Sequence, residues 1–183
     1  MGRERPRVSA ETLSGRTALN TDDLIKHVAA NFARIYLGGI PSLLNDDGAF
    51  LSFISTLTAI EALGGFLSPT LGNGPRFKTF VQRYFPDPYP GQADLLWKLR
   101  NAAVHGFSPG PYKLTHHNSH LHLTHDAGLT VLNAEDFYAT LVSASKRYFD
   151  DVAKDPALQA AFAQRAGHPD TGVLVVGPLT GVP

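Results

Sequence analysis

The sequence of 183 residues contains no cysteine, which excludes disulfides, a thiol nucleophile and zinc sites built from cysteine ligands. Charge is also scarce, because only 17% of the residues are Asp, Glu, Lys or Arg, and 16 basic residues balance 16 acidic ones. A chain with zero formal net charge is not held to nucleic acid by its overall field, since such binding grows with the number of phosphates neutralised. A local basic patch remains compatible with this balance.

The sequence also has no long apolar run. No uninterrupted run reaches the length that a membrane span needs, and the basic N-terminal segment MGRERPRVSAETLSGRT has no apolar stretch behind it. We therefore expect a cytoplasmic protein without a membrane segment or a secretory signal. The hydrophobic fraction of 43% is typical of a globular chain, and the length fits one domain.

The domain is expected to cover residues 20–167. Residues 1–19 are polar and unpatterned, which predicts a disordered arm, and residues 168–183 are rich in Gly and Pro, which predicts a loose tail or a partner-dependent strand. Apolar residues at helical spacing predict six helices between these ends. The expected helices cover 21–37, 49–66, 75–85 and 91–105, followed by one capped by Asn133 and one after Asp155-Pro156.

Two local patterns refine this fold. The 49–66 helix is apolar or small nearly all round, so we expect it at the centre of the domain, with Leu-Gly-Gly at 63–65 as its stop signal. The run YKLTHHNSHLHLTHD alternates polar and apolar residues around Asn118-Ser119, which predicts a β-hairpin over about 112–124, and GLTVL is a candidate third strand. The fold class is therefore mainly α, with a small β-hairpin after the fourth helix.

The stretch LLWKLRNAAVHGFSPG, residues 95–110, gathers three polar side chains at the end of a helix: Arg100, Asn101 and His105. Asn101 and His105 are four residues apart and share a helix face, whereas Arg100 lies about 140° around the axis from His105. A long Arg side chain can close that gap. Gly106 is the expected end of the helix.

These three residues have two interpretations. Arg and His in a last turn satisfy free carbonyl groups and complement the negative end of the helix dipole. Alternatively, His105 transfers a proton, Arg100 binds a phosphate through its planar guanidinium, and Asn101 orients one of them. The spacing alone does not decide between these interpretations.

Glu61 is the single charged residue of the predicted central helix. A carboxylate on such a helix is costly unless a positive or donating group meets it, so Glu61 is either an edge residue, a structural ion pair or a supporting residue of the site. If Glu61 is buried, Arg100 is its expected partner. Lys98 is a second possible supporting residue, because basic residues outnumber acidic ones in the segment 76–105. The basic residues are Arg76, Lys78, Arg83, Lys98 and Arg100, and the acidic ones are Asp87 and Asp94.

The pattern RNAAVH, from Arg100 to His105, resembles the signature of the HEPN superfamily, in which an Arg, often followed by a polar residue, precedes a His by a few residues. Gly106 and the aromatic Phe107, which follow the His, also match the pattern of several bacterial subgroups of this superfamily. The wider resemblance includes AIEALGGFL and RFKTFVQRYFPDPY, covers residues 20–150 loosely and is most specific over 95–107.

The resemblance implies an antiparallel HEPN-like helical bundle that pairs two motifs in a homodimer. It implies a metal-independent endoribonuclease without a cofactor. In such an enzyme His105 assists activation of the ribose 2′-hydroxyl, Arg100 stabilises charge on the scissile phosphate, and Asn101 has a positioning role. Toxin–antitoxin, phage-defence or stress-response roles, with an antitoxin-like partner, are implied in the same way. Phe107 stands where some members have a Tyr that a partner enzyme modifies, which argues against that regulation here.

Other members keep the fold without nuclease activity, so the alternative is a silent module that binds RNA, a nucleotide or a protein. A third possibility is a metal-binding protein, because five histidines fall between 116 and 125. On the expected hairpin, His117, His120 and His122 share one face and are weak candidate ligands for zinc or nickel. We favour a polar strand face and expect no designed metal site.

Overall fold

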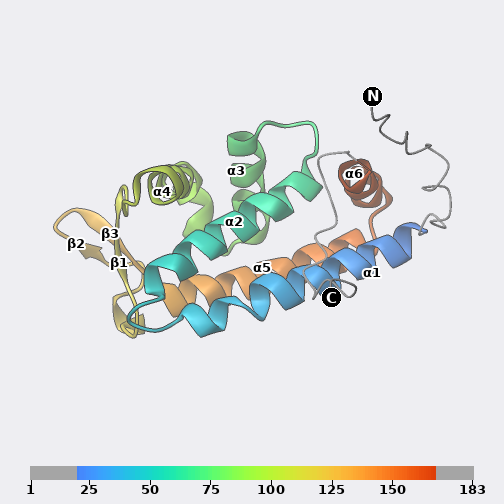
Figure 1. Ribbon diagram of the computed structural model, residues 1–183. Coiled ribbons are helices and arrows are strands. Elements are labelled where there is room, and N and C mark those ends of the chain that lie inside the picture. The colour runs from blue at the N-terminus through green and yellow to red at the C-terminus, as the bar shows by residue number, and fades with distance from the viewer. Residues whose placement is uncertain (1–19, 168–183) are drawn as a thin grey trace, which may run out of the picture.

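The computed structural model describes residues 20–167, so the predicted arm at 1–19 and tail at 168–183 lie outside the described residues. The described chain is mainly helical, with six α-helices and one small sheet (Figure 1). The helices are α1 (Thr21–Phe32), α2 (Ala49–Leu67), α3 (Asn73–Tyr84), α4 (Ala93–Gly106), α5 (Ala134–Val152) and α6 (Pro156–Ala166); the strands are β1 (Tyr112–Thr115), β2 (His125–Asp126) and β3 (Leu129–Asn133).

All six predicted helices are present. A π-helical segment, Ala33–Leu37, extends α1, and short 3₁₀ turns precede α2 and α4. The side chain of Asn20 caps α1 by accepting the N–H of Asp23, one residue before the expected start at Thr21. Asp155 caps α6 by accepting two backbone N–H groups. Asn133 directly precedes α5 but makes no side-chain capping bond to it, so that part of the prediction was wrong; its Oδ1 accepts the N–H of Asn118 instead.

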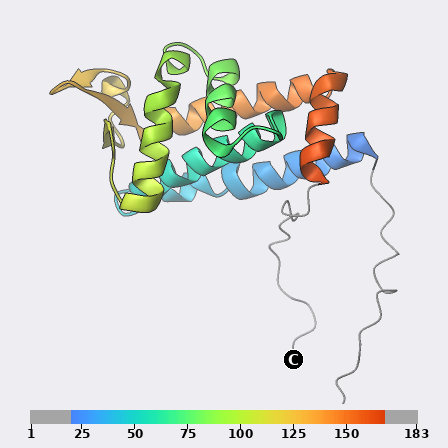
Figure 2. The same cartoon turned by 90° about the horizontal axis from the view of Figure 1, so that it is seen from above.

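Helix α2 lies at the centre, as its apolar sequence predicts. Figures 1 and 2 show α1, α2 and α5 running along the molecule while α3, α4 and α6 cross them, and α2 contacts α3, α4, α5 and α6. Leu57 and Ile60 of α2 are fully buried. The same buried cluster contains aromatic side chains of α3 and α5, including Phe77, Phe80 and Phe137, so apolar burial is the main stabilising contribution of this core.

The same helix is relevant to the expectation about long apolar segments. Helix α2 is long and apolar enough, by length and composition, to cross a membrane, and 61% of its most apolar window is buried inside the fold. The core helix of a folded domain passes the same test. The expectation that the protein has no membrane segment therefore stays a prediction.

The helix ends also differ from the prediction in two places. Helix α2 does not stop at Leu-Gly-Gly but continues to Leu67. A Cβ at Gly64 would lie 2.5 Å from the carbonyl oxygen of Arg76, so the glycine is a packing contact and not a stop signal. Gly106 is likewise helical, and Phe107 ends α4 in the left-handed conformation at φ 48°.

The predicted β-hairpin around Asn118-Ser119 was wrong. Strand β1 pairs in parallel with β3, and β3 pairs antiparallel with β2, giving the strand order β1-β3-β2. After Thr115 the chain turns at His117, with φ 55°, into a short 3₁₀ turn. The alternating pattern misled because polar groups of the 116–122 segment bond to the start of α5 and not across a hairpin. GLTVL is present as β3, the central strand.

Candidate functional site

Helix α4 positions the three predicted site residues. Its buried residues, Leu96, Leu99 and Ala103, recur at helical spacing and fix which face meets the core. Arg100 therefore lies at the border of that face, and its side chain is 16% exposed. His105 lies one turn further along and is exposed.

Arg100 joins the three side chains. Its Nη1 lies 3.1 Å from Nε2 of His105 and 3.3 Å from Oδ1 of Asn101. The Arg side chain thus spans the angle around the helix that spacing alone left open. Because a guanidinium has donors only, Nε2 of His105 is the acceptor and has no proton in this arrangement. Asn101 and His105, which were expected to share a helix face, are linked through Arg100.

Glu61 faces this group from α2. Its side chain is 10% exposed, and its Oε2 lies 2.7 Å from Nη2 of Arg100, so the ion pair expected from the sequence is present. Nη2 of Arg76, on α3, lies 3.9 Å from Oε1 of the same carboxylate. Arg100 also lies over the ring of Trp97, with 5.4 Å between Cζ and the ring centroid. These contacts preorganise the guanidinium from several sides.

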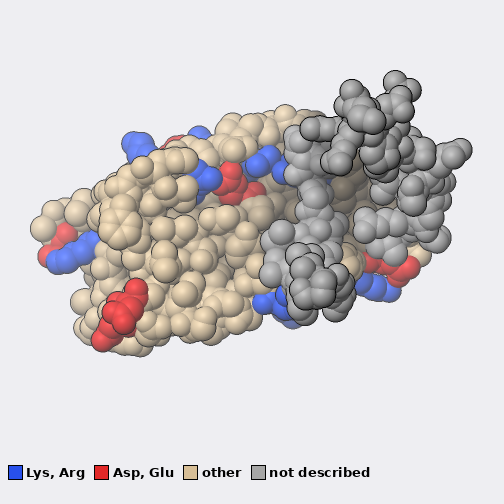
Figure 3. All heavy atoms as spheres, in the orientation of Figure 1, with Lys and Arg blue, Asp and Glu red and all other residues tan. Residues whose placement is uncertain are grey.

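Arg76 and Arg165 extend the positive group along α2. The Cβ position at Gly65 would lie 3.6 Å from Cζ of Arg76 and 3.4 Å from Nε of Arg165, so both side chains converge on this glycine. Burial and the nearby charge of Arg165 lower the pKa of Arg76, while Glu61 opposes them. Burial and the charge of Glu61 raise the pKa of Tyr36. Figure 3 shows acidic atoms between two basic patches where α2, α3 and α4 meet.

Arg76 and Arg100 therefore share the carboxylate of Glu61, and the guanidinium of Arg165 adds further positive charge near Arg76. Within residues 20–167, the buried Nε atoms of Arg76 and Arg100 have no hydrogen-bond partner. Sequence inspection assigned Arg76 only to the general basic surface, and it gave no role to Arg165. Their convergence depends on the packing of α3 and α6 on α2, which no local pattern encodes.

Lys98 does not join this group. It is exposed, and within the described residues it forms no hydrogen bond or ion pair. Its charge acts on Asp94, whose pKa is held below its usual value mainly by a hydrogen bond from Lys78. Lys98 is therefore a solvated residue of α4 and not a contact of Arg100.

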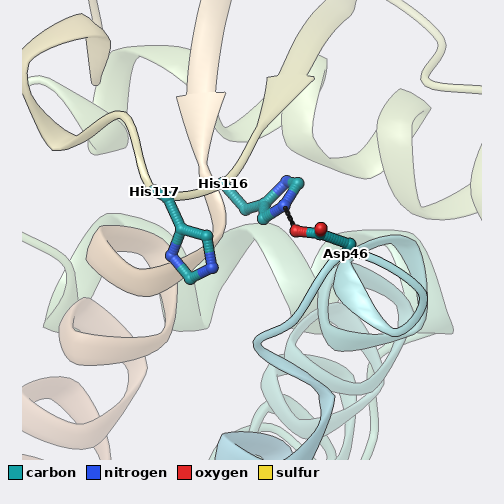
Figure 4. Close-up of side chains that lie close together, drawn as sticks. All are labelled: Asp46, His116 and His117. Atoms are coloured by element: carbon teal, nitrogen blue, oxygen red, sulfur yellow. Dashed lines mark hydrogen bonds and ion pairs between the residues drawn. The ribbon is translucent and has the colours of Figure 1, made fainter.

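The predicted metal candidates are not brought together. His122 is held by the hydroxyl of Tyr89, 2.8 Å from its Nε2, and by the backbone N–H of Asn133, which donates to its Nδ1. Burial lowers the pKa of His122, against the opposing charge of Asp136. His120 is exposed. His117 instead lies beside His116 and Asp46, a group that the sequence did not indicate (Figure 4).

Phe107 is the most exposed large apolar residue among those described. Its side chain is 82% exposed, and its ring contacts Phe50 at 4.8 Å between centroids. A left-handed backbone is uncommon for any residue but glycine and is strained for a bulky one. Phe107 and Phe50 line an open apolar cavity of about 680 Å³ with Tyr112, Leu114 and Leu129. An apolar surface thus begins two residues after His105.

Comparison of the chain with protein-family models, with curated proteins and with solved structures gives no match.

Proposed function

We propose that this chain is a metal-independent endoribonuclease of HEPN type that cleaves RNA through the ribose 2′-hydroxyl. The observation that supports the proposal is the position of Arg100, whose guanidinium contacts His105, Asn101 and Glu61 at once. A proton-transfer group and a phosphate-binding group within hydrogen-bond distance are what this reaction requires. The antiparallel HEPN-like bundle is part of the same proposal.

In this mechanism the scissile phosphate binds Arg100 and competes for its Nη1 atom. The lone pair on Nε2 of His105 is then free to accept the proton of the 2′-hydroxyl. The 2′-oxygen forms a bond to phosphorus, and the bond from phosphorus to the 5′-oxygen breaks as that oxygen takes up a proton from water. His105 then releases the proton that it accepted to solvent, so the step is proton-neutral overall. The products are a 2′,3′-cyclic phosphate and a free 5′-hydroxyl, and no metal or cofactor enters the balance.

The surrounding charges suit a polyanion. Arg76 and Arg165 lie along α2 next to the Arg100–Glu61 pair, so an RNA strand leaving the cleavage point would meet further guanidinium groups. Asn101 is half-buried and held by Arg100, which suits a positioning role. This local group of guanidinium side chains would allow a chain of zero net charge to bind RNA.

We further propose that two copies of the chain pair through the surface around Phe107, close to both motifs. A strained, exposed aromatic next to an apolar cavity is the kind of surface that a partner of the same chemistry covers. A cytoplasmic location, an antitoxin-like protein partner and a role in phage defence or stress response belong to the same proposal and follow from the family resemblance.

Replacing Phe107 with Asp is expected to convert the dimer to a monomer, because a charge at the centre of an apolar interface is costly to bury. Asp tolerates the left-handed backbone better than most residues, so the fold should persist. Light scattering over a concentration series measures the mass. Leu71→Asp, at an exposed leucine beyond α2, is the control and should remain dimeric. A wild-type chain that stays monomeric at every concentration would contradict the dimer.

The experiment that tests the nuclease is incubation of the full chain with mixed RNA in EDTA. We expect discrete cleavage with cyclic phosphate ends, detected by end-specific ligation and mass spectrometry. Cleavage that requires added divalent metal would contradict the mechanism. The use of mixed RNA is needed because the geometry does not select a target sequence.

The second candidate function is a silent binding module for RNA or another phosphate-bearing ligand. The observation in its favour is that Glu61 already neutralises part of the charge on Arg100, as a purely structural pair would. In that case the folded protein retains oligonucleotides but leaves all of them intact. The incubation in EDTA, combined with a binding assay, distinguishes the two functions.

A further inference from the structure

Three side chains from two distant segments meet at one end of the molecule. Asp46 lies in the turn before α2, and His116 and His117 follow β1. Figure 4 shows the carboxylate of Asp46 directed at the ring of His116, with the ring of His117 beside them, and 2.8 Å separates Nε2 of His116 from Oδ1 of Asp46. We propose that these three residues bind one divalent transition-metal ion, of the type that zinc represents.

The spacing fits such an ion. The candidate ligand atoms of Asp46, His116 and His117 all lie within 4.8 Å of one another. Metal–ligand bonds of about 2.0–2.1 Å in a tetrahedral site place ligand atoms about 3.3 Å apart. Small side-chain rotations are therefore enough to bring all three atoms to one ion. Two imidazoles and a carboxylate form a set that suits zinc, nickel or cobalt better than magnesium or calcium.

Glu135 completes the arrangement from the first turn of α5. Its Oε1 lies 2.8 Å from Nδ1 of His117, and both of its carboxylate oxygens accept the backbone N–H of the same residue, at 3.1 and 3.2 Å. Nε2 of His117 is then the ring nitrogen available to a metal. Histidines that bind metals commonly donate their other N–H to a carboxylate in this way, which fixes the ring and its tautomer.

The backbone also favours the site. Successive residues of a strand point to opposite faces, yet the rings of His116 and His117 are 4.7 Å apart between centroids. Strand β1 ends at Thr115, and the chain then turns at His117, whose φ of 55° is in the left-handed region. The side chain of Asn118 holds the turn by donating to the carbonyl of His116 and to Thr115. A strained turn that gathers two imidazoles is thus held rigidly in place.

An adjoining cavity leaves room for a further ligand. Asp46 and His116 border a cavity of about 270 Å³ that is otherwise lined mainly by apolar residues, including Phe50, Phe53 and Leu114. Three protein ligands leave one position of a tetrahedral ion open, and a water molecule or a small anion would fill it. The bound ion would tie the turn before α2 to the end of β1.

Titration of the chelator-treated full chain, without a polyhistidine tag, with zinc in a calorimeter tests this proposal. We expect one ion per chain and, at a zinc concentration of one hundred times the Kd, a melting temperature higher by roughly 5–10 °C. Cobalt should give the visible absorption of a tetrahedral site. The double variant His116→Ala/His117→Ala should lose at least 100-fold in affinity, and Glu135→Gln about 10–100-fold with unchanged stoichiometry.

The matched control is His120→Ala/His125→Ala, which removes two exposed imidazoles from the same region and should bind zinc like the wild type. The variant Asp46→Asn keeps the shape of a side chain that is 89% exposed, so the variant protein should fold normally. It should bind zinc weakly, which keeps the test decisive even if the histidine double variant unfolds. Absence of saturable binding by the wild type would overturn the proposal. Equal loss in the control double variant would overturn it as well, because binding would then reflect histidine content alone. These readouts do not involve RNA, so they are independent of the proposed nuclease activity.

Discussion

Substitution of His105 by Ala is expected to lower the rate of RNA cleavage by about 10²–10⁴-fold, the usual contribution of a positioned acid–base group. Nε2 of His105 lies 3.1 Å from Nη1 of Arg100 and is exposed, so it can reach a ribose hydroxyl without rearrangement of the core. Single-turnover cleavage of an RNA in EDTA measures the loss. Exposed substitutions change stability by about 0.5 kcal/mol or less, so the melting temperature should stay close to that of the wild type.

The matched control is His120→Ala, which removes an exposed imidazole outside α4 and should leave the rate unchanged. Arg100→Lys adds a second readout, because Lys keeps the charge but loses the fork that holds both His105 and a phosphate. A His105→Ala protein with the wild-type rate would remove His105 from the mechanism. Loss of rate together with a large fall in melting temperature would assign His105 a structural role instead.

The second large effect is expected at Glu61. Replacement by Gln keeps the shape but removes the negative charge that faces Arg100 at 2.7 Å and Arg76 at 3.9 Å. Removing one partner of a buried ion pair costs about 3–5 kcal/mol, and the 10% exposure of Glu61 favours the lower end. A loss of about 3 kcal/mol lowers the melting temperature by roughly 6–12 °C in a domain of this size. Differential scanning calorimetry measures it.

Two further variants test the cause of this loss. Asp150→Asn removes the acid of an exposed pair with Lys146 and should cost less than about 0.5 kcal/mol. The double variant Glu61→Leu/Arg100→Leu should recover part of the stability, since it leaves one buried charge fewer without a partner. A Glu61→Gln protein that melts within about 2 °C of the wild type would show that the pair is not needed for folding.

The helices could be predicted because their signals are local. Apolar spacing, the capping residue Asp155 and the apolar run of α2 each act within a few residues of their own positions. The strand arrangement could not be predicted in this way. The backbone N–H of Asn118 donates to the side chain of Asn133 at the end of β3, and the hydroxyl of Ser119 donates to Asp136 in α5. These partners replace the cross-strand bonds that the alternating pattern suggested.

In the candidate site, too, residues with local signals could be predicted and residues brought together by the fold could not. The sequence indicated Arg100, Asn101 and His105 because they share one helix, and it indicated Glu61 because a charge on an apolar helix needs a partner. The convergence of Arg76 and Arg165 depends on close helix packing at Gly64 and Gly65, which only the fold reveals. In the same way, Asp46 and His116 are 70 residues apart, so no spacing rule could pair them.

The central claim is that the 2′-hydroxyl of the substrate is the nucleophile, activated next to Arg100 and His105. The most direct measurement compares two oligonucleotides of one sequence that spans a cleavage site found in mixed RNA, one fully ribose and one 2′-deoxy at the scissile position, both in EDTA. We expect the ribose strand to be cleaved to a cyclic phosphate and a 5′-hydroxyl, while the deoxy strand is bound and stays intact. Cleavage of both strands at similar rates, or an intact ribose strand in the presence of folded protein, would contradict the claim.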